Sequence, residues 1–253
     1  MLKAILHGKA GRIEHGGQDS VRWASVFKAR EDLLTSTFFE RFAYLSDDVQ
    51  TQILASCFSL SPDDFQAKFG AFQSIDYWPR YGLSEGGESR QVEPDLVIRF
   101  ELCNLIVEVK PPAGGDQYFE QWHKEIESFL QSEDDSPKDL YFLAIGRIEK
   151  KQALEWANKL LSKQESNPLK GIAAIKWDAV AAHLVELLNN DQASNALNIS
   201  SQEKRILNDI LDGLSLYGLQ TSPFTWSQLI QPEVFPKLSL QHTLLLPVSK
   251  ESR

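Results

Sequence analysis

The first part of the chain carries apolar residues at helical spacing. From about Trp23 to Ser59, apolar side chains recur mostly three or four positions apart, which predicts helices with one buried face. The polar stretch Ser46-Asp47-Asp48 interrupts this spacing and offers a helix N-cap. We therefore expect a long first helix and then a second one from about Asp48 to Phe58.

The pattern changes after this helical block. Aromatic and β-branched residues dominate positions 69–79 and predict a strand, and the polar, glycine-containing stretch SEGGESRQ at 84–91 predicts a loop. The runs LVIRF, at 96–100, and IVEVK, at 106–110, are typical of buried strands. They predict a β-hairpin with its turn near residues 101–104.

Helices and apolar strands alternate in the second half. We expect a helix over about 116–131 and one ending near Lys163, a buried strand at 140–146, a short strand GIAAIKW and a helix over 178–188. The fold class is therefore α/β, a mixed central sheet flanked by helices. A polar linker at 191–200 suggests one domain over 1–190 and a small C-terminal helical extension and tail over 200–253, with a helix at 202–216.

Composition is ordinary, but charge is not. Of the 253 residues, 42% are hydrophobic and 24% charged, which fits a globular chain. The two cysteines, Cys57 and Cys103, indicate neither a disulfide framework nor a zinc site and should be buried. Without an apolar run long enough for a membrane span or signal peptide, we expect a cytoplasmic protein and no membrane partner. The net charge is -9, and the sequence contains no basic stripe. Contact with nucleic acid therefore has to be local or aided by a partner.

Three charged residues interrupt the predicted hairpin. Glu108 and Lys110 are two apart in a strand and so share a face, while Val107 and Val109 point to the opposite layer. Asp95 begins the preceding strand and can meet Glu108 across the hairpin. Two converging carboxylates can bind Mg²⁺, or Mn²⁺ in its place. Lys110 can stabilise the negative charge that develops on a phosphodiester during its hydrolysis.

The residues Pro94-Asp95 and Glu108-Val109-Lys110 resemble the PD-(D/E)XK nuclease superfamily. The resemblance implies a restriction-endonuclease-like fold, and a metal-dependent DNA endonuclease of bacterial restriction, anti-phage or anti-plasmid defence, or mobile-element processing. It also implies a glutamate on the helix before the core strands, for which Glu31 is a better candidate than Glu40, as a further metal ligand. A glutamine on the helix after the E-x-K strand is the remaining expected site residue. Gln121 matches it best among Gln117, Gln121 and Glu125, which lie four apart.

Other interpretations stay open at this point. Glu108 and Lys110 could protect the solvent face of an edge strand from aggregation. Glu31, Glu40 and Gln121 could be ordinary polar residues on helices. The acidic charge also fits a nuclease-fold scaffold subunit of a larger defence or recombination complex, without activity of its own. RNA is a possible substrate besides DNA, and cleavage of both DNA strands would need two sites, hence a homodimer or a protein partner.

Overall fold

The structure, a computed structural model, describes residues 2–13, 20–28, 30–132, 138–162, 168–189 and 198–222. Of the Pro-containing tail expected after the helix at 202–216, the part from residue 223 onward lies outside them. Within the described ranges, none of the helices combines the length and apolar character needed to cross a lipid bilayer.

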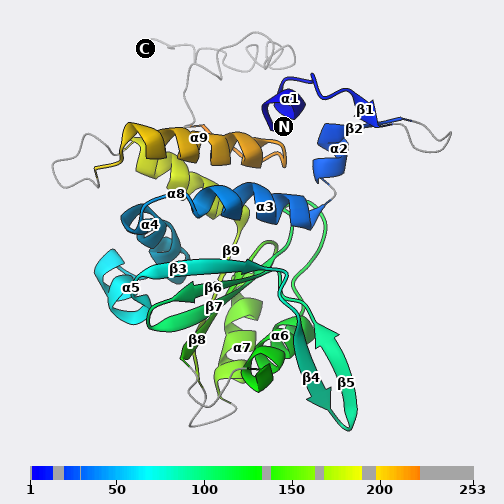
Figure 1. Ribbon diagram of the computed structural model, residues 1–253, viewed down its shortest axis with the longest axis vertical. Helices are drawn as coiled ribbons and strands as arrows, with labels where there is room; N and C mark the ends of the chain where they lie inside the picture. The colour runs from blue at the N-terminus through cyan, green and yellow to red at the C-terminus, as the bar shows by residue number, and fades with distance from the viewer. Residues whose placement is uncertain are drawn as a thin grey trace, which may run out of the picture. The chain divides into compact units, whose positions relative to one another are not determined.

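A mixed five-stranded sheet forms the centre, in the order β3-β6-β7-β8-β9 (Figure 1). Its strands are β3 (Phe72–Tyr77), β6 (Leu96–Phe100), β7 (Cys103–Val109), β8 (Asp139–Ile145) and β9 (Leu169–Ile175). The first three are antiparallel to one another, and β7, β8 and β9 run parallel. The predicted hairpin and the two later strands are confirmed. Strand β7 is thus the middle strand, with a neighbour on each side.

Alternation along the strands divides the core into two layers. Leu105, Val107 and Val109 of β7 belong to a large apolar cluster on one face, whereas Ile106 belongs to a smaller cluster on the other. Helices α3 (Glu31–Phe42), α4 (Asp47–Phe58), α5 (Pro62–Phe69), α8 (Trp177–Asn189) and α9 (Ser201–Ser215) contribute to the larger cluster. Helices α6 (Phe119–Ser132) and α7 (Lys150–Leu161) form the smaller cluster. The fold class, a mixed α/β sheet flanked by helices, is as expected.

Two expectations for the first hundred residues are wrong. The long first helix is divided into α2 (Trp23–Lys28) and α3 by Arg30, whose backbone is extended. The acidic first turn of α3, Glu31-Asp32, suits a helix N-terminus, a signal that the hydrophobic spacing does not contain. The expected loop at 84–91 is instead a hairpin of β4 (Tyr81–Glu85) and β5 (Glu88–Val92).

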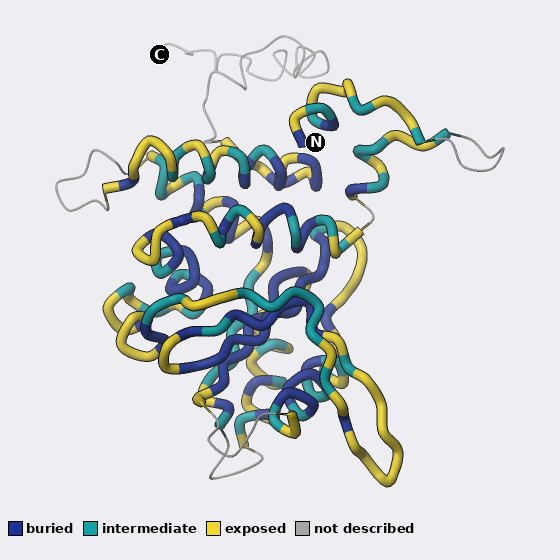
Figure 2. Tube along the Cα trace, viewed as in Figure 1, coloured by how far each residue is buried: buried dark blue, intermediate teal, exposed yellow. Residues whose placement is uncertain are grey.

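The hairpin was missed because its outer part is polar on both faces. Gly86 and Gly87 both have positive φ, 59° and 85°, as a two-residue hairpin turn requires. Figure 2 shows the hairpin mostly exposed, in contrast to the buried central strands. Leu83 is its one fully buried side chain, and the backbone N–H of Ser84 donates to the side chain of Gln131 of α6. A strand with so little to bury lacks the alternation that predicts strands.

The chain ends are arranged differently from the expected domains. Helix α9, which the sequence placed in a separate extension, packs against α3 and α8 and buries Leu207, Ile210 and Leu214 in the larger cluster. The compact unit accordingly runs from Met1 to Thr221. Before α2, the chain forms the short elements α1 (Leu2–Leu6), β1 (Arg12–Ile13) and β2 (Val21–Arg22). Cys57 and Cys103 are both buried, as predicted.

Candidate active site

The three charged residues of the predicted hairpin meet at one end of the strands β6 and β7. Leu96 of β6 pairs with Val107 of β7, so the register brings Asp95 opposite Glu108. Asp95 Oδ2 accepts a hydrogen bond of 2.8 Å from the backbone N–H of Val109. Glu108 is 1% exposed, Asp95 7% and Lys110 8%. The interpretation of Glu108 and Lys110 as the solvent face of an edge strand is wrong, because β7 is central and both residues are buried.

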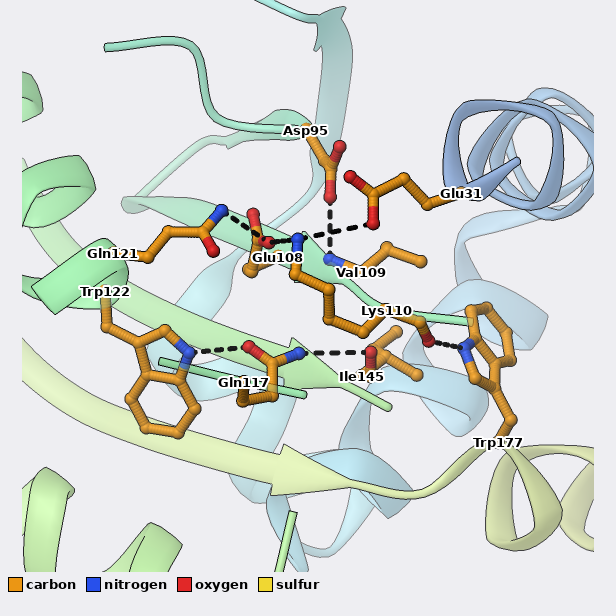
Figure 3. Close-up of polar contacts among 10 residues, drawn as sticks. All are labelled: Glu31, Asp95, Glu108, Val109, Lys110, Gln117, Gln121, Trp122, Ile145 and Trp177. Carbon is orange, nitrogen blue, oxygen red and sulfur yellow. Dashed lines mark hydrogen bonds and ion pairs between the residues drawn. The ribbon is translucent and has the colours of Figure 1, made fainter. Parts of the chain in front are cut away.

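Lys110 joins the strand to the first turn of α3. Its ammonium Nζ lies 2.6 Å from Glu108 Oε1 and 3.3 Å from Glu31 Oε2 (Figure 3). Glu31 is half-exposed and reaches the cluster from the helix start that Arg30 creates. Glu40 is exposed on the same helix, and its charge helps to raise the pKa of Tyr77. Of the two candidate glutamates, the structure brings Glu31 to the cluster.

Helix α6 covers the other side of Glu108. Gln121 Nε2 donates a hydrogen bond of 2.7 Å to Glu108 Oε1, as Figure 3 shows. One turn further along, the carboxyl of Glu125 is 1% exposed and adjoins Glu108 and Gln121, and its Oε2 is buried without a hydrogen-bond partner among the described residues. The sequence predicts Glu125 on the same helix face as Gln121 but gives it no part in the site. Its i, i+4 spacing from Gln121 was the available signal.

The backbone of Lys110 is held on two sides. Its N–H donates to the carbonyl of Ile145, and its carbonyl accepts a 2.9 Å hydrogen bond from the indole of Trp177, the first residue of α8. Gly146 follows β8 with φ of 145°, and a Cβ there would lie 2.8 Å from both the Cβ and the carbonyl oxygen of Lys110. Only glycine permits this approach, because a side chain would displace Lys110. Neither Trp177 nor Gly146 was predicted from sequence.

Gln117 does not lie on the helix face of Gln121, and its side chain has a structural role. It precedes α6, which begins at Phe119 and not near residue 116 as expected. Its side chain accepts a hydrogen bond from Trp122 Nε1 and donates to the carbonyl oxygen of Ile145. Gln117 therefore connects the start of α6 to the end of β8 and lets α6 present Gln121 and Glu125.

Burial dominates the titration of the cluster. It raises the pKa of Asp95 to about 8, with the charge of Glu108 adding to the rise and the Val109 N–H opposing it. Burial also raises the pKa of Glu108, against the effect of Lys110. Burial and the neighbouring Glu108 charge raise the pKa of Glu125 well above its usual range. Burial lowers the pKa of Lys110, but Glu108, Glu31 and Asp95 outweigh it and leave that pKa above its ordinary value, so Lys110 is a cation.

The carboxylates of Asp95 and Glu108 are the groups in this cluster that could hold a hard divalent cation. The carboxyl groups of Glu108, Glu31 and Asp95 surround the single ammonium of Lys110, so acid groups are in excess once they ionise. No hydrogen bond from a described residue reaches Asp95 Oδ1, which leaves that oxygen for a ligand. Among the described residues, no three His, Cys, Asp or Glu side chains are arranged to hold a metal ion. Mg²⁺ commonly uses one or two carboxylates, with waters and substrate oxygens completing its shell, so two ligands are enough.

Comparison with known proteins leaves the family open. No protein-family model matches the sequence, and no solved structure matches it significantly. The chain is 29% identical over 235 residues to an uncharacterised protein of Pasteurella multocida (strain Pm70), and the match covers 89% of this chain and 83% of that protein. This similarity extends over nearly the whole chain and carries no activity with it.

Proposed function

We propose that this protein is a divalent-metal-dependent nuclease that hydrolyses phosphodiester bonds in DNA. The observation that carries the proposal is the buried cluster of Asp95, Glu108 and Lys110 on the central strands. Charged groups at such depth are costly unless they are paired or used. A scaffold without chemistry could fill these positions with apolar residues at no loss of stability.

Each residue of the cluster has a distinct task in this reaction. Asp95 and Glu108 would hold Mg²⁺ or Mn²⁺, with Glu31 as a further oxygen donor. A divalent ion supplies a Lewis acid for a phosphoryl oxygen and lowers the pKa of an attacking water. Lys110 places a fixed positive charge where negative charge develops on the phosphate. Gln121 orients Glu108 through its amide hydrogen bond.

The architecture supports the proposal at the level of fold. The P-D and E-x-K residues lie at adjacent ends of two antiparallel strands, and the next strands are parallel to the second of them. A helix before the strands supplies Glu31, and a helix after them supplies Gln121. This is the arrangement that the resemblance to the PD-(D/E)XK superfamily implies. We propose a restriction-endonuclease-like core on this ground.

Cleavage by matched variants tests the proposal. Purified wild type should nick or linearise supercoiled plasmid with Mg²⁺ or Mn²⁺ and not with EDTA, and Asp95→Ala and Lys110→Ala should abolish this. Glu40→Ala, which changes an exposed glutamate on the same helix as Glu31, should cleave like wild type. Equal cleavage by wild type and both site variants would end the proposal. Single-stranded DNA and RNA are included as substrates to fix the class of nucleic acid.

The second candidate is a nuclease-fold scaffold subunit, which the net charge of -9 favours. Titration of Mg²⁺ and Mn²⁺ into wild type and Asp95→Asn by calorimetry separates the two. A nuclease should bind one or more ions with an affinity that Asp95→Asn lowers. A scaffold should show no difference between the two proteins.

A further inference from the structure

A pocket adjoins the Asp95 cluster on the side of the polar hairpin. It has a volume of about 430 Å³ and is lined by Asp32, Trp78, Arg80 and Glu93; we call it the Trp78 pocket. One covalent connection and one hydrogen bond join the pocket to the cluster. Asp32 follows Glu31 in the first turn of α3, and the backbone N–H of Trp78 donates to the carbonyl oxygen of Asp95 over 3.0 Å. An occupant of this pocket is therefore a neighbour of any group bound at Asp95.

Trp78 is held in a costly state. Its φ of 46° lies in the left-handed region, which is unusual for a bulky residue, and its indole Nε1 is buried without an acceptor among the described residues. The ring packs against Tyr77 at 5.7 Å between centroids but is only half-buried. The core does not require this indole, since the apolar clusters on both faces of the sheet form without it. Costly conformations of this kind are characteristic of ligand sites.

The polar groups of the pocket select against phosphate. Arg80 is already paired with Glu93 over 2.6 Å. The Asp32 carboxylate makes no hydrogen bond or ion pair with any described residue and remains a free acceptor. With Arg80 paired to Glu93, the Asp32 carboxylate leaves the lining with a net negative charge, which disfavours a phosphate group. A carboxylate instead accepts hydrogen bonds from an exocyclic amine, as it does from cytosine N4.

We propose that the Trp78 pocket receives one unpaired nucleobase that carries an exocyclic amino group. The base stacks on the indole and donates its amino group to Asp32, while the adjoining phosphate lies at the Asp95 cluster. This last point rests on the proposed nuclease function. The volume suits a small aromatic group, and stacking does not depend on net positive charge. An acidic protein can hold nucleic acid in this way, and its substrate is then single-stranded or locally unpaired.

Binding without metal tests the pocket apart from cleavage. In EDTA, fluorescence anisotropy measures the affinity of the full chain for three labelled strands of about twelve nucleotides: oligo(dC), oligo(dU) and an abasic strand. Wild type should bind oligo(dC) about ten-fold more tightly than the abasic strand, with oligo(dU) between them. Trp78→Ala should reduce oligo(dC) to the abasic level. Asp32→Asn should remove the preference for oligo(dC) over oligo(dU).

Two further variants keep the test decisive. Trp78→Phe preserves an aromatic face and should retain most of the affinity, which covers the case in which Trp78→Ala does not fold. Tyr44→Ala removes an aromatic ring that is 73% exposed and outside the pocket lining, and it should bind like wild type.

The outcomes separate the pocket from the nuclease. Wild type that binds no strand, or binds the abasic strand as well as oligo(dC), overturns the pocket. Folded Trp78→Ala with unchanged affinity does so too, and an unaltered preference in Asp32→Asn overturns the amino-group contact. Base-dependent binding without metal-dependent cleavage would sustain the pocket and overturn the nuclease. Metal-dependent cleavage together with base-independent binding would support the proposed nuclease function and overturn the proposed base-binding role of the Trp78 pocket.

Discussion

The two faces of the central sheet differ in the side chains that they bury. The face toward α3, α4, α8 and α9 is an apolar layer in which Phe38, Phe39 and Phe42 pack edge-to-face or stacked with one another, and Phe38 also packs edge-to-face against Trp177. The face toward α6 has a smaller apolar cluster and, beside it, buried Glu108 and Glu125. Burial of apolar side chains on the first face stabilises the fold, whereas buried ionisable groups on the second cost stability unless they are paired. The contrast supports the proposal that the polar face has a catalytic role.

The largest effect should come from the apolar face. Phe38→Ala removes a ring that is 1% exposed and should lower the free energy of unfolding by about 3–5 kcal/mol. Thermal unfolding should shift down by on the order of 10 °C. Tyr44→Ala, which removes an exposed ring on the loop after α3, should change the free energy of unfolding by less than about 0.5 kcal/mol. A small loss in Phe38→Ala would mean that this face does not carry the stability.

The next effect concerns activity. Lys110→Met keeps the volume of the side chain but removes its charge, and metal-dependent cleavage should fall about 100- to 1000-fold. Stability should change less than in Phe38→Ala, because Glu108, whose pKa burial already raises, can take up a proton. Lys176→Met, at a half-exposed lysine paired with Glu149, is the matched control and should cleave normally. A large stability loss with full activity in Lys110→Met would reverse the comparison.

Gly146 directly follows the last residue of β8 and lies against Lys110. Gly146→Ala should lower the unfolding free energy by about 1–3 kcal/mol and reduce cleavage, since φ is 145° and the new Cβ forces Lys110 to move. Gly82→Ala places a methyl group in open space in the hairpin and should be neutral. Chemical denaturation and plasmid cleavage measure the two quantities. Normal cleavage in folded Gly146→Ala would show that Lys110 tolerates displacement.

The polar face should also make stability depend on pH. The pKa of Asp95 is raised to about 8 in the folded protein, so between its ordinary value and 8 the folded state binds more protons than the unfolded state. This contribution is complete at acid pH and is lost as pH rises through 8. In EDTA, the melting temperature of wild type relative to Asp95→Asn should therefore fall from pH 5 to pH 9, by a few degrees. Mg²⁺ should offset the fall, since it binds the ionised form. A constant difference between the two proteins would exclude this titration.

The smallest effect is expected at Glu125. Glu125→Gln keeps a hydrogen-bonding side chain but cannot ionise, so the unfolding free energy at pH 8 should rise by about 1 kcal/mol or less. The variant tests whether Glu125 contributes only cost on this face. Glu127→Gln, at a partly exposed position on the same helix, should leave the stability unchanged. A loss of stability in Glu125→Gln would show that the carboxyl itself supports the fold.

Local patterns predicted most of the regular structure. Apolar alternation and helical spacing depend on which residues share a face, so β6, β7, β8, α4 and the pairing of Asp95 with Glu108 followed from the sequence. The hairpin β4–β5 and the break at Arg30 did not, because they bury too little to create a pattern.

What the sequence by itself determined is that Asp95, Glu108 and Lys110 share one face of a hairpin. Only the tertiary structure decided that β7 is the central strand, that Glu31 and not Glu40 reaches Lys110, and that Glu125 faces Glu108. The Trp78 pocket is likewise made by segments far apart in the chain. The physical reason is that periodicity shows which residues of one element point the same way. Which other element they meet depends on how all the elements pack together.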